Sequence, residues 1–196
     1  MIPSLSSLDS FASFLPKLLF FSKLGIAVEA GVSILKIEGR SKGPEYVYET
    51  ASCYREAAES FQAGTYSPEK VSGWMTRLKN VYNRGFWGGY FLGKELGEWT
   101  DAPGSKAKER KSYIGLGVKY FGKIKVGEFK LQTGSLKVGD EVMITGPTTG
   151  LVRTTVEELR LEEASQEEIN RRGAHFSMPV PVKIRPSDKL FKIEPQ

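Results

Sequence analysis

A strand-like run lies between two helical patterns in residues 24–64, and this order restricts the fold more than any other feature of the chain. Residues 32–37, Val-Ser-Ile-Leu-Lys-Ile, form a short run with β-branched side chains that predicts a buried strand. Gly31 ends the helical pattern before it, Pro44 opens the one after it, and Gly64 ends that one. Helix–strand–helix is the repeating unit of an α/β barrel or an open parallel sheet. A lone parallel strand has no neighbours, so we expect the strands that complete the sheet to be missing from this sequence.

The helix expected after Pro44 carries an apolar stripe. Its members recur at intervals of four and three residues and are Val47, Ala51, Tyr54, Ala58 and Phe61. A further helix is predicted to start at Ser67, a suitable N-cap, with Pro68 at the first helical position. The apolar face of that helix consists of Val71, Trp74, Leu78 and Val81.

The pattern changes from Tyr113 onward, where short β-rich runs alternate with glycine turns. The runs are residues 113–118, 126–131, 140–145, 151–156, 179–184 and 190–193. Six short strands at this spacing predict a small closed or nearly closed β-barrel. The predicted fold class is therefore α/β plus all-β, with a remnant of an α/β barrel and connecting helices in residues 1–98, a polar linker in residues 99–111 and the small β-barrel in residues 112–196.

Cysteine content restricts both compartment and chemistry. Cys53 is the only cysteine, so the chain has neither a disulfide framework nor an all-cysteine metal site, and a reducing, cytoplasmic location fits best. We interpret Cys53, which lies on the predicted helix, as a buried structural thiol and not as a metal ligand. The apolar stretch of residues 11–21 is interrupted by Pro16 and Lys17 and is too short to cross a bilayer. We interpret it as neither a signal peptide nor a membrane anchor.

The first candidate site consists of Lys36, Glu38 and Arg40, which alternate along the predicted strand and its exit. Alternate residues of a strand share a face. Charged residues at the C-terminal end of a strand in an α/β barrel often serve the active site. The alternative, a structural ion-pair cluster at the barrel rim, has the same sequence pattern and stays open.

A second candidate lies where the helix from Ser67 ends, at Asn83 and Arg84. Arg84 is suited to hold a phosphate or carboxylate with two parallel hydrogen bonds. We favour the other interpretation, a helix-terminating turn whose aromatic residues pack on the main body. His175, the only histidine, lies in a loop-like stretch without a recognisable catalytic partner, and we interpret it as a loop or edge residue.

Basic charge is concentrated between residues 106 and 130, which hold eight Lys and Arg residues against two Glu, whereas the whole chain carries only +5. Lys119, Lys123 and Lys125 lie in this stretch, and Tyr120 and Phe121 are interleaved with them. Basic residues mixed with aromatic ones are typical of nucleic-acid surfaces. The alternative is an ordinary solvated face.

Several motifs in order resemble those of peptidase family U32. Residues 30–40 (Ala-Gly-Val-Ser-Ile-Leu-Lys-Ile-Glu-Gly-Arg), 43–47 and 54–57 resemble the final barrel unit of that family. Residues 83–86 with 89–93 resemble the motif that follows it. The β-rich part, with Leu-Lys-Val-Gly-Asp-Glu at 136–141, is similar to the family's C-terminal domain, itself similar to the second-domain barrel of elongation factor Tu.

The resemblance implies an α/β barrel that carries the active site, with Lys36, Glu38 and Arg40 facing its mouth. Members of the family are described as collagenase-like proteases. Relatives hydroxylate RNA, including the wobble uridine of tRNA, or act in quinone hydroxylation, with an iron–sulfur cluster on cysteines and, in some, prephenate as the hydroxyl donor. The cysteine-bearing signature of the family has no counterpart here, so we expect no cofactor in this chain and no catalysis by it alone.

Three functions remain open. The first is the C-terminal fragment of a U32 protein of the tRNA-hydroxylation type whose β-barrel docks RNA through Lys119, Lys123 and Lys125, with Asn83 and Arg84 as further substrate contacts. The second is a collagenase-like peptidase acting on a peptide substrate, which requires a nucleophile or metal site that the sequence does not reveal. The third is a stand-alone RNA-binding module without catalysis.

Overall fold

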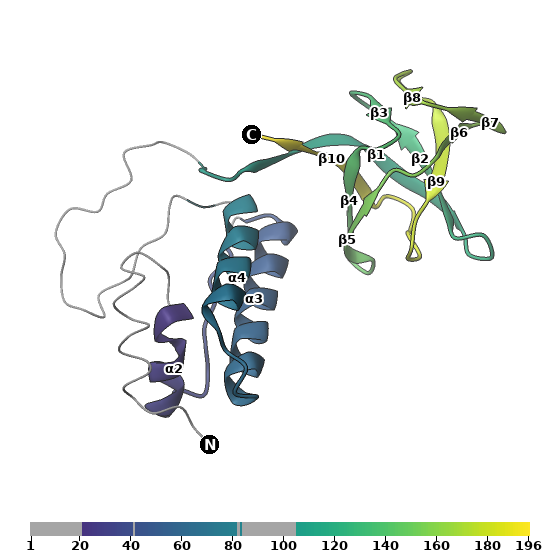
Figure 1. The fold of residues 1–196 in the computed structure, drawn as a ribbon. Coiled ribbons are helices and arrows are strands. Elements are labelled where there is room, and N and C mark those ends of the chain that lie inside the picture. The colour runs from purple at the N-terminus through teal and green to yellow at the C-terminus, as the bar shows by residue number, and fades with distance from the viewer. Residues whose placement is uncertain (1–20, 41, 82, 84–104) are drawn as a thin grey trace. The chain divides into compact units, whose positions relative to one another are not determined.

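The computed structural model describes residues 21–40, 42–81, 83 and 105–196. The chain divides into two compact units, Met1–Lys108 and Glu109–Gln196, here called unit 1 and unit 2. Unit 1 contains the helices α2 (Phe21–Glu29), α3 (Pro44–Gln62) and α4 (Pro68–Asn80), shown in Figure 1. None of the helices in the described part of the chain is long and apolar enough to cross a membrane.

The helix boundaries follow from local chemistry and confirm the predicted ends. Pro44 and Glu45 occupy the first turn of α3. Backbone N–H groups in that turn have no partner within the helix, so proline costs no hydrogen bond there, and the acidic Glu45 lies at the positive end of the helix dipole. Gly64 follows α3 with φ of +66°, a backbone conformation that favours glycine. The Ser67 hydroxyl caps α4 by accepting a hydrogen bond from the Lys70 backbone N–H at 3.4 Å.

The core of unit 1 lies among α2, α3 and α4. Its buried members are Phe21, Leu24, Cys53, Ala57, Val71, Trp74, Met75 and Leu78. The predicted apolar face of α4 is confirmed, because Val71, Trp74, Leu78 and Val81 are all buried. The predicted stripe of α3 is confirmed only in part: Tyr54 packs against this core, whereas Val47 is exposed. The buried residues of α3 are Thr50, Ser52, Cys53, Ala57 and Ser60. Small side chains therefore form the packed face of α3, and part of its apolar stripe faces solvent.

The predicted strand at residues 32–37 does not form. The segment has no regular secondary structure, and Ile34 is 83% exposed. The described part of unit 1 contains no strand with which it could pair. A run of β-branched residues makes a strand only when a neighbour supplies the hydrogen bonds, so local propensity fails here.

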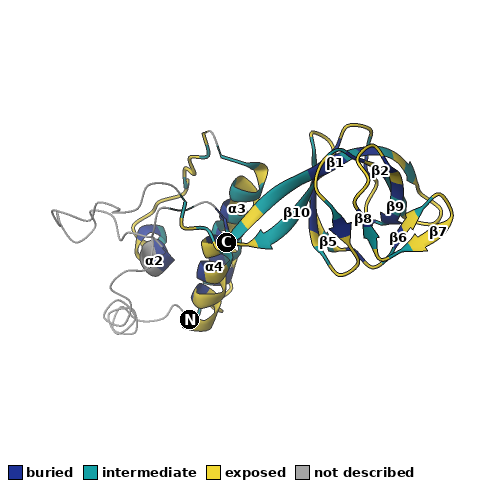
Figure 2. Ribbon diagram, turned by 90° about the horizontal axis from the view of Figure 1, so that it is seen from above, coloured by how far each residue is buried: buried dark blue, intermediate teal, exposed yellow. Residues whose placement is uncertain are grey.

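Unit 2 is built from ten strands. They are β1 (Glu109–Phe121), β2 (Val126–Leu131), β3 (Leu136–Lys137), β4 (Glu141–Gly146), β5 (Gly150–Thr155), β6 (Leu159–Leu161), β7 (Ala164–Gln166), β8 (Glu168–Ile169), β9 (His175–Pro179) and β10 (Lys189–Pro195). Eight form one sheet in the order β5-β4-β10-β1-β2-β9-β6-β7, and β3 pairs with β8. Every pairing is antiparallel. Figure 2 shows the curled sheet, with the buried positions of its strands in dark blue.

The long strand β1 bends to bridge the two halves of the sheet. It pairs with β10 and with β2, and its register shifts between Tyr113 and Gly115 in the first pairing and between Gly117 and Lys119 in the second. Such irregularities increase the local twist and curve a sheet. Gly115 is required there, because a β-carbon would collide with the Lys130 carbonyl oxygen.

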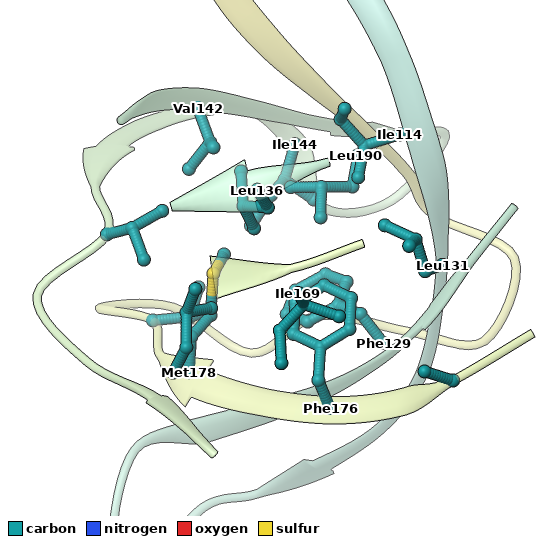
Figure 3. Close-up of a cluster of buried hydrophobic side chains, with 14 of the residues drawn as sticks. Ile114, Phe129, Leu131, Leu136, Val142, Ile144, Ile169, Phe176, Met178 and Leu190 are labelled. Atoms are coloured by element: carbon teal, nitrogen blue, oxygen red, sulfur yellow. The ribbon is translucent and has the colours of Figure 1, made fainter. Parts of the chain in front are cut away.

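The interior of unit 2 is filled by side chains from most of its strands, as Figure 3 shows. Its fully buried members include Phe129, Leu131, Leu136, Ile144, Phe176 and Leu190. The rings of Phe129 and Phe176, which face each other in the β2–β9 register, have centroids 5.8 Å apart. This core, rather than a disulfide or a metal, holds the described part of unit 2 together.

The strand predictions for unit 2 are largely confirmed. Strands cover five of the six predicted runs, and β1 begins inside the stretch assigned to the linker. The prediction for residues 179–184 is wrong: the strand there is β9, His175–Pro179, and residues 180–188 form a loop. His175 accordingly lies in a strand and not in a loop. The short strands β3, β6, β7 and β8 were not predicted.

Candidate functional site

Lys36, Glu38 and Arg40 lie on the exposed segment between α2 and α3. The Glu38 carboxylate accepts a hydrogen bond from the Arg40 backbone N–H at 3.2 Å and lies 3.5 Å from Arg40 Nε. Lys36 is exposed and takes no part in that pair. Both side chains of the pair are exposed, and exposed ion pairs contribute little to stability. An active site at these three residues stays a prediction.

Asn83 lies just after the end of α4 and forms hydrogen bonds both to the last turn of that helix and to residues 105–106. Its side-chain amide donates to the carbonyl oxygens of Lys79 at 3.3 Å and Val81 at 3.0 Å. Its backbone N–H donates to Ser105 Oγ at 3.3 Å, and its carbonyl oxygen accepts from the Lys106 N–H at 2.7 Å. These bonds favour the interpretation as a helix-terminating turn. Arg84, the other half of this candidate, lies outside the described residues.

Sequence reasoning missed a charged cluster between α3 and α4. Arg77 Nε donates to Glu49 at 2.9 Å, and Arg77 Nη1 donates to both oxygens of Glu56 at 2.9 and 2.8 Å. The Trp74 indole N–H donates to the same Glu56 carboxylate at 2.9 Å. Partial burial alone would raise the pKa of Glu56, but the hydrogen bonds from Arg77 and Trp74 outweigh it and lower that pKa. The residues are far apart in sequence and only the packing of the two helices unites them, so no local pattern reveals them.

Cys53 lies beneath this cluster, and its thiol contacts the Trp74 carbonyl oxygen at 3.9 Å. Burial raises the pKa of Cys53 to about 11, which keeps the thiol protonated. A metal ligand or nucleophile must be a thiolate, so Cys53 suits neither role. The described residues contain no group of three or more His, Cys, Asp and Glu side chains placed to hold a metal ion. The residues present therefore do not fit an iron–sulfur cluster.

Lys119, Lys123 and Lys125 lie on the hairpin that joins β1 to β2, and all three are exposed. The turn closes with a hydrogen bond from the Ile124 N–H to the Phe121 carbonyl oxygen at 3.2 Å. Two apolar side chains stand among the lysines: Phe121 is 38% exposed and Ile124 is 68% exposed. The Lys119 ammonium lies 4.9 Å from the centroid of the Phe121 ring, a distance at which cation and ring attract. The structure thus brings together the three lysines and the aromatic residue that the charge pattern singled out.

A second loop lies against this hairpin. The Val180 N–H donates to the Lys125 carbonyl oxygen at 2.9 Å, and the Ser187 N–H donates to the Gly117 carbonyl oxygen at 2.9 Å. The Tyr120 hydroxyl donates to the Val180 carbonyl oxygen at 3.2 Å. This β9–β10 loop presents Val182, Lys183 and Arg185. Sequence reasoning missed it as a neighbour, because residues 179–184 were predicted to be a strand.

Together the hairpin and the loop form what we call the basic rim. Its members are Lys119, Phe121, Lys123, Ile124, Lys125, Val182, Lys183 and Arg185. Acidic groups close to it are already engaged: Asp188 is buried and accepts from the Arg185 N–H and the Thr149 hydroxyl, and Glu128 contacts the His175 ring at 2.9 Å. The five cations of the rim therefore leave a positive surface around exposed apolar side chains.

Comparison with known proteins gives the family. Residues 16–101 match the model of peptidase family U32. A collagenase of Porphyromonas gingivalis is 48% identical over 167 residues, which are 85% of this chain and 46% of that protein. The chain belongs to peptidase family U32. This U32 chain is also 27% identical to tRNA hydroxylation protein P1 of Bacillus subtilis over 84% of its own length and 39% of that protein.

The C-terminal domain of a protein described as a U32 peptidase from Geobacillus thermoleovorans is 17% identical, with a TM-score of 0.39, over 41% of this chain and 90% of that one. The U32 chain spans less than half the length of the collagenase and of the tRNA hydroxylation protein. Since unit 1 has 108 residues, the match of 167 residues to the collagenase includes at least 59 residues of unit 2. Both units therefore recur together in relatives.

Proposed function

We propose that this U32 chain is the RNA-docking part of a tRNA-hydroxylation protein, in which unit 2 holds the RNA near a catalytic α/β barrel. The observation that carries the proposal is the hairpin with Lys119, Lys123 and Lys125 around the exposed Phe121 ring. A lysine-rich surface neutralises phosphates and releases counterions, and an exposed ring accepts a base. Relatives named for tRNA hydroxylation support the choice of RNA as the polyanion.

Within the same proposal, Lys36, Glu38 and Arg40 lie at the mouth of the α/β barrel, and unit 2 is a barrel of the kind found in the second domain of elongation factor Tu. The exposed apolar side chains of Val32, Ile34 and Ile37 support the first part, because a parallel sheet would bury them. The chemistry of hydroxylation would come from cysteines and a cofactor outside this chain, which has a single buried cysteine.

A collagenase-like peptidase is the second candidate, because the collagenase of P. gingivalis is 48% identical whereas the tRNA hydroxylation protein of B. subtilis is 27% identical. It predicts activity on peptides and no dependence on the lysines of the hairpin. The two candidates therefore differ in whether RNA or a peptide is retained by the surface of unit 2.

The test is the affinity of the 196-residue chain for tRNA at increasing salt concentration. The triple variant Lys119→Ala/Lys123→Ala/Lys125→Ala should bind more weakly. Its plot of log affinity against log salt concentration should be flatter by about 2.1–2.7, because each of three lost phosphate contacts removes roughly 0.7–0.9 from the slope. Lys137→Ala is the matched control, since Lys137 lies on β3 beside Glu168 at 3.5 Å and away from the hairpin. Equal affinity and slope in the triple variant and the parent chain would reject the proposal.

A further inference from the structure

The basic rim combines two loops that are distant in sequence, and the geometry points to a more specific ligand than RNA in general. We propose that the rim binds an unpaired segment of nucleic acid, with the Phe121 ring stacked on a base and with Lys183 and Arg185 of the β9–β10 loop on the phosphate backbone. This inference rests on the proposed RNA-binding function and names the form of RNA that the site accepts.

The two loops of the basic rim are held rigidly together. Three hydrogen bonds connect the loop to the hairpin at both ends of their contact, at Lys125, Tyr120 and Gly117. The loop is also fixed from below, because Asp188 accepts a hydrogen bond from the Arg185 N–H at 2.8 Å and Arg185 Nη1 lies 3.3 Å from Thr149 Oγ1. Figure 1 shows the β1–β2, β4–β5 and β9–β10 connections at one end of the sheet. A surface held in this way loses little conformational entropy when it binds.

The rim places apolar side chains among basic ones. Phe121, Ile124 and Val182 are 38%, 68% and 41% exposed, and they come from both loops. Lysines and Arg185 flank them on the hairpin and on the loop. A duplex presents phosphates to such a surface and keeps its bases stacked inside, so the apolar side chains of the rim would make no contact with a base. Unpaired bases offer their faces, and stacking on an aromatic ring contributes on the order of 1–3 kcal/mol per base.

Phe121 has the surroundings that such a role requires. The Lys119 ammonium lies over its ring at 4.9 Å, so a base that stacks on Phe121 brings its own phosphate close to a cation. The ring is not part of the buried core of unit 2, and its replacement should leave the fold intact. A substitution of Phe121 can therefore test RNA binding without changing the stability of unit 2.

The experiment measures binding of the full chain to two RNAs of equal charge, a stem-loop with an unpaired loop and a fully paired duplex. Phe121→Leu keeps an apolar side chain and removes the ring; it should weaken stem-loop binding about 5- to 150-fold and leave duplex binding unchanged. Lys183→Ala/Arg185→Ala should flatten the salt dependence of stem-loop binding by about 1.4, the value for two contacts to a single strand. Lys137→Ala is again the control, and thermal unfolding of each variant checks that it is folded.

The outcomes separate the two proposals. If the parent chain binds neither RNA, the proposed function fails and this inference fails with it. If the parent chain binds RNA through Lys119, Lys123 and Lys125 but Phe121→Leu and Lys183→Ala/Arg185→Ala bind like the parent, only this inference fails. Equal affinity for stem-loop and duplex also overturns it. Binding to vesicles of phosphatidylserine and phosphatidylcholine in preference to the stem-loop would identify the rim as a lipid-binding surface instead.

Discussion

Glu56 shows how one carboxylate can connect two helices of unit 1. It accepts hydrogen bonds from Arg77 on α4 and from the Trp74 indole, and its pKa is lowered by them against the opposing effect of burial. A carboxylate with a lowered pKa stabilises the folded state above its unfolded value, here 4.5, and that contribution is lost as the pH falls below it. Unit 1 should therefore lose stability in acid partly through Glu56.

Glu56→Gln is expected to reduce this acid sensitivity. The free energy of unfolding at pH 7 should fall by about 1 kcal/mol or less, because Glu56 and Arg77 are both more than a third exposed and solvent weakens their attraction. Below pH 4.5 the difference from the parent chain should shrink. Denaturant unfolding monitored by tryptophan fluorescence reports on unit 1, since every tryptophan of the chain lies there. The exposed Glu29 supplies the control variant Glu29→Gln, and an equal pH dependence in parent and Glu56→Gln would contradict the assignment.

The turn between β4 and β5 depends on the absence of a side chain at Gly146. A β-carbon there would collide with the Asp188 carboxylate, which is buried and already bonded to Thr149 and to the Arg185 N–H. Gly146→Ala should lower the stability of unit 2 by about 1–3 kcal/mol, as overpacking usually does. Gly122→Ala in the hairpin is the matched control, because its nearest neighbour is Tyr120 at 3.8 Å. Thermal unfolding followed by circular dichroism compares the two, and equal midpoints would show that the site relaxes freely.

Sequence patterns predict an element well when its own residues determine it. Pro44, Gly64 and Ser67 mark helix ends through local chemistry, and the runs of β1, β2, β4, β5 and β10 are long enough to identify. Strands of two or three residues such as β3 and β6 have no measurable period. Pro179 and Pro181 lack the N–H that a ladder needs, so the β-branched run around them becomes a loop.

The residues of the basic rim also differ in whether the sequence alone predicts them. The charge excess around Lys119, Lys123 and Lys125 is visible in the sequence because one hairpin carries it. Lys183 and Arg185 join them only because β2 pairs with β9, which brings the β9–β10 loop beside the hairpin. That proximity is a property of the topology, and no spacing of residues encodes it.

For the molecule as a whole, the two units raise the question of which activity the chain can carry by itself. The match to the P. gingivalis collagenase includes residues of both units, yet it spans 46% of that protein. Many peptidases use a nucleophile with a base, or a metal that activates water. In the described part of this chain Cys53 is buried with a raised pKa, the exposed His175 contacts Glu128, and no metal-binding group of acidic, His and Cys side chains is found.

We therefore expect the purified 196-residue chain to bind tRNA without hydrolysing gelatin or a collagen peptide above background. The measurement is release of fluorescence from labelled gelatin over hours, with a known collagenase as positive control and the same preparation tested for tRNA binding. Any activity that survives further purification must be shown to belong to the chain, and the variants Lys36→Ala, Glu38→Gln and Arg40→Ala provide that test. Hydrolysis that these substitutions abolish would assign a peptidase centre to the segment before α3 and reject the RNA-docking role. Binding without hydrolysis would leave catalysis to the part of the relatives that this chain does not span.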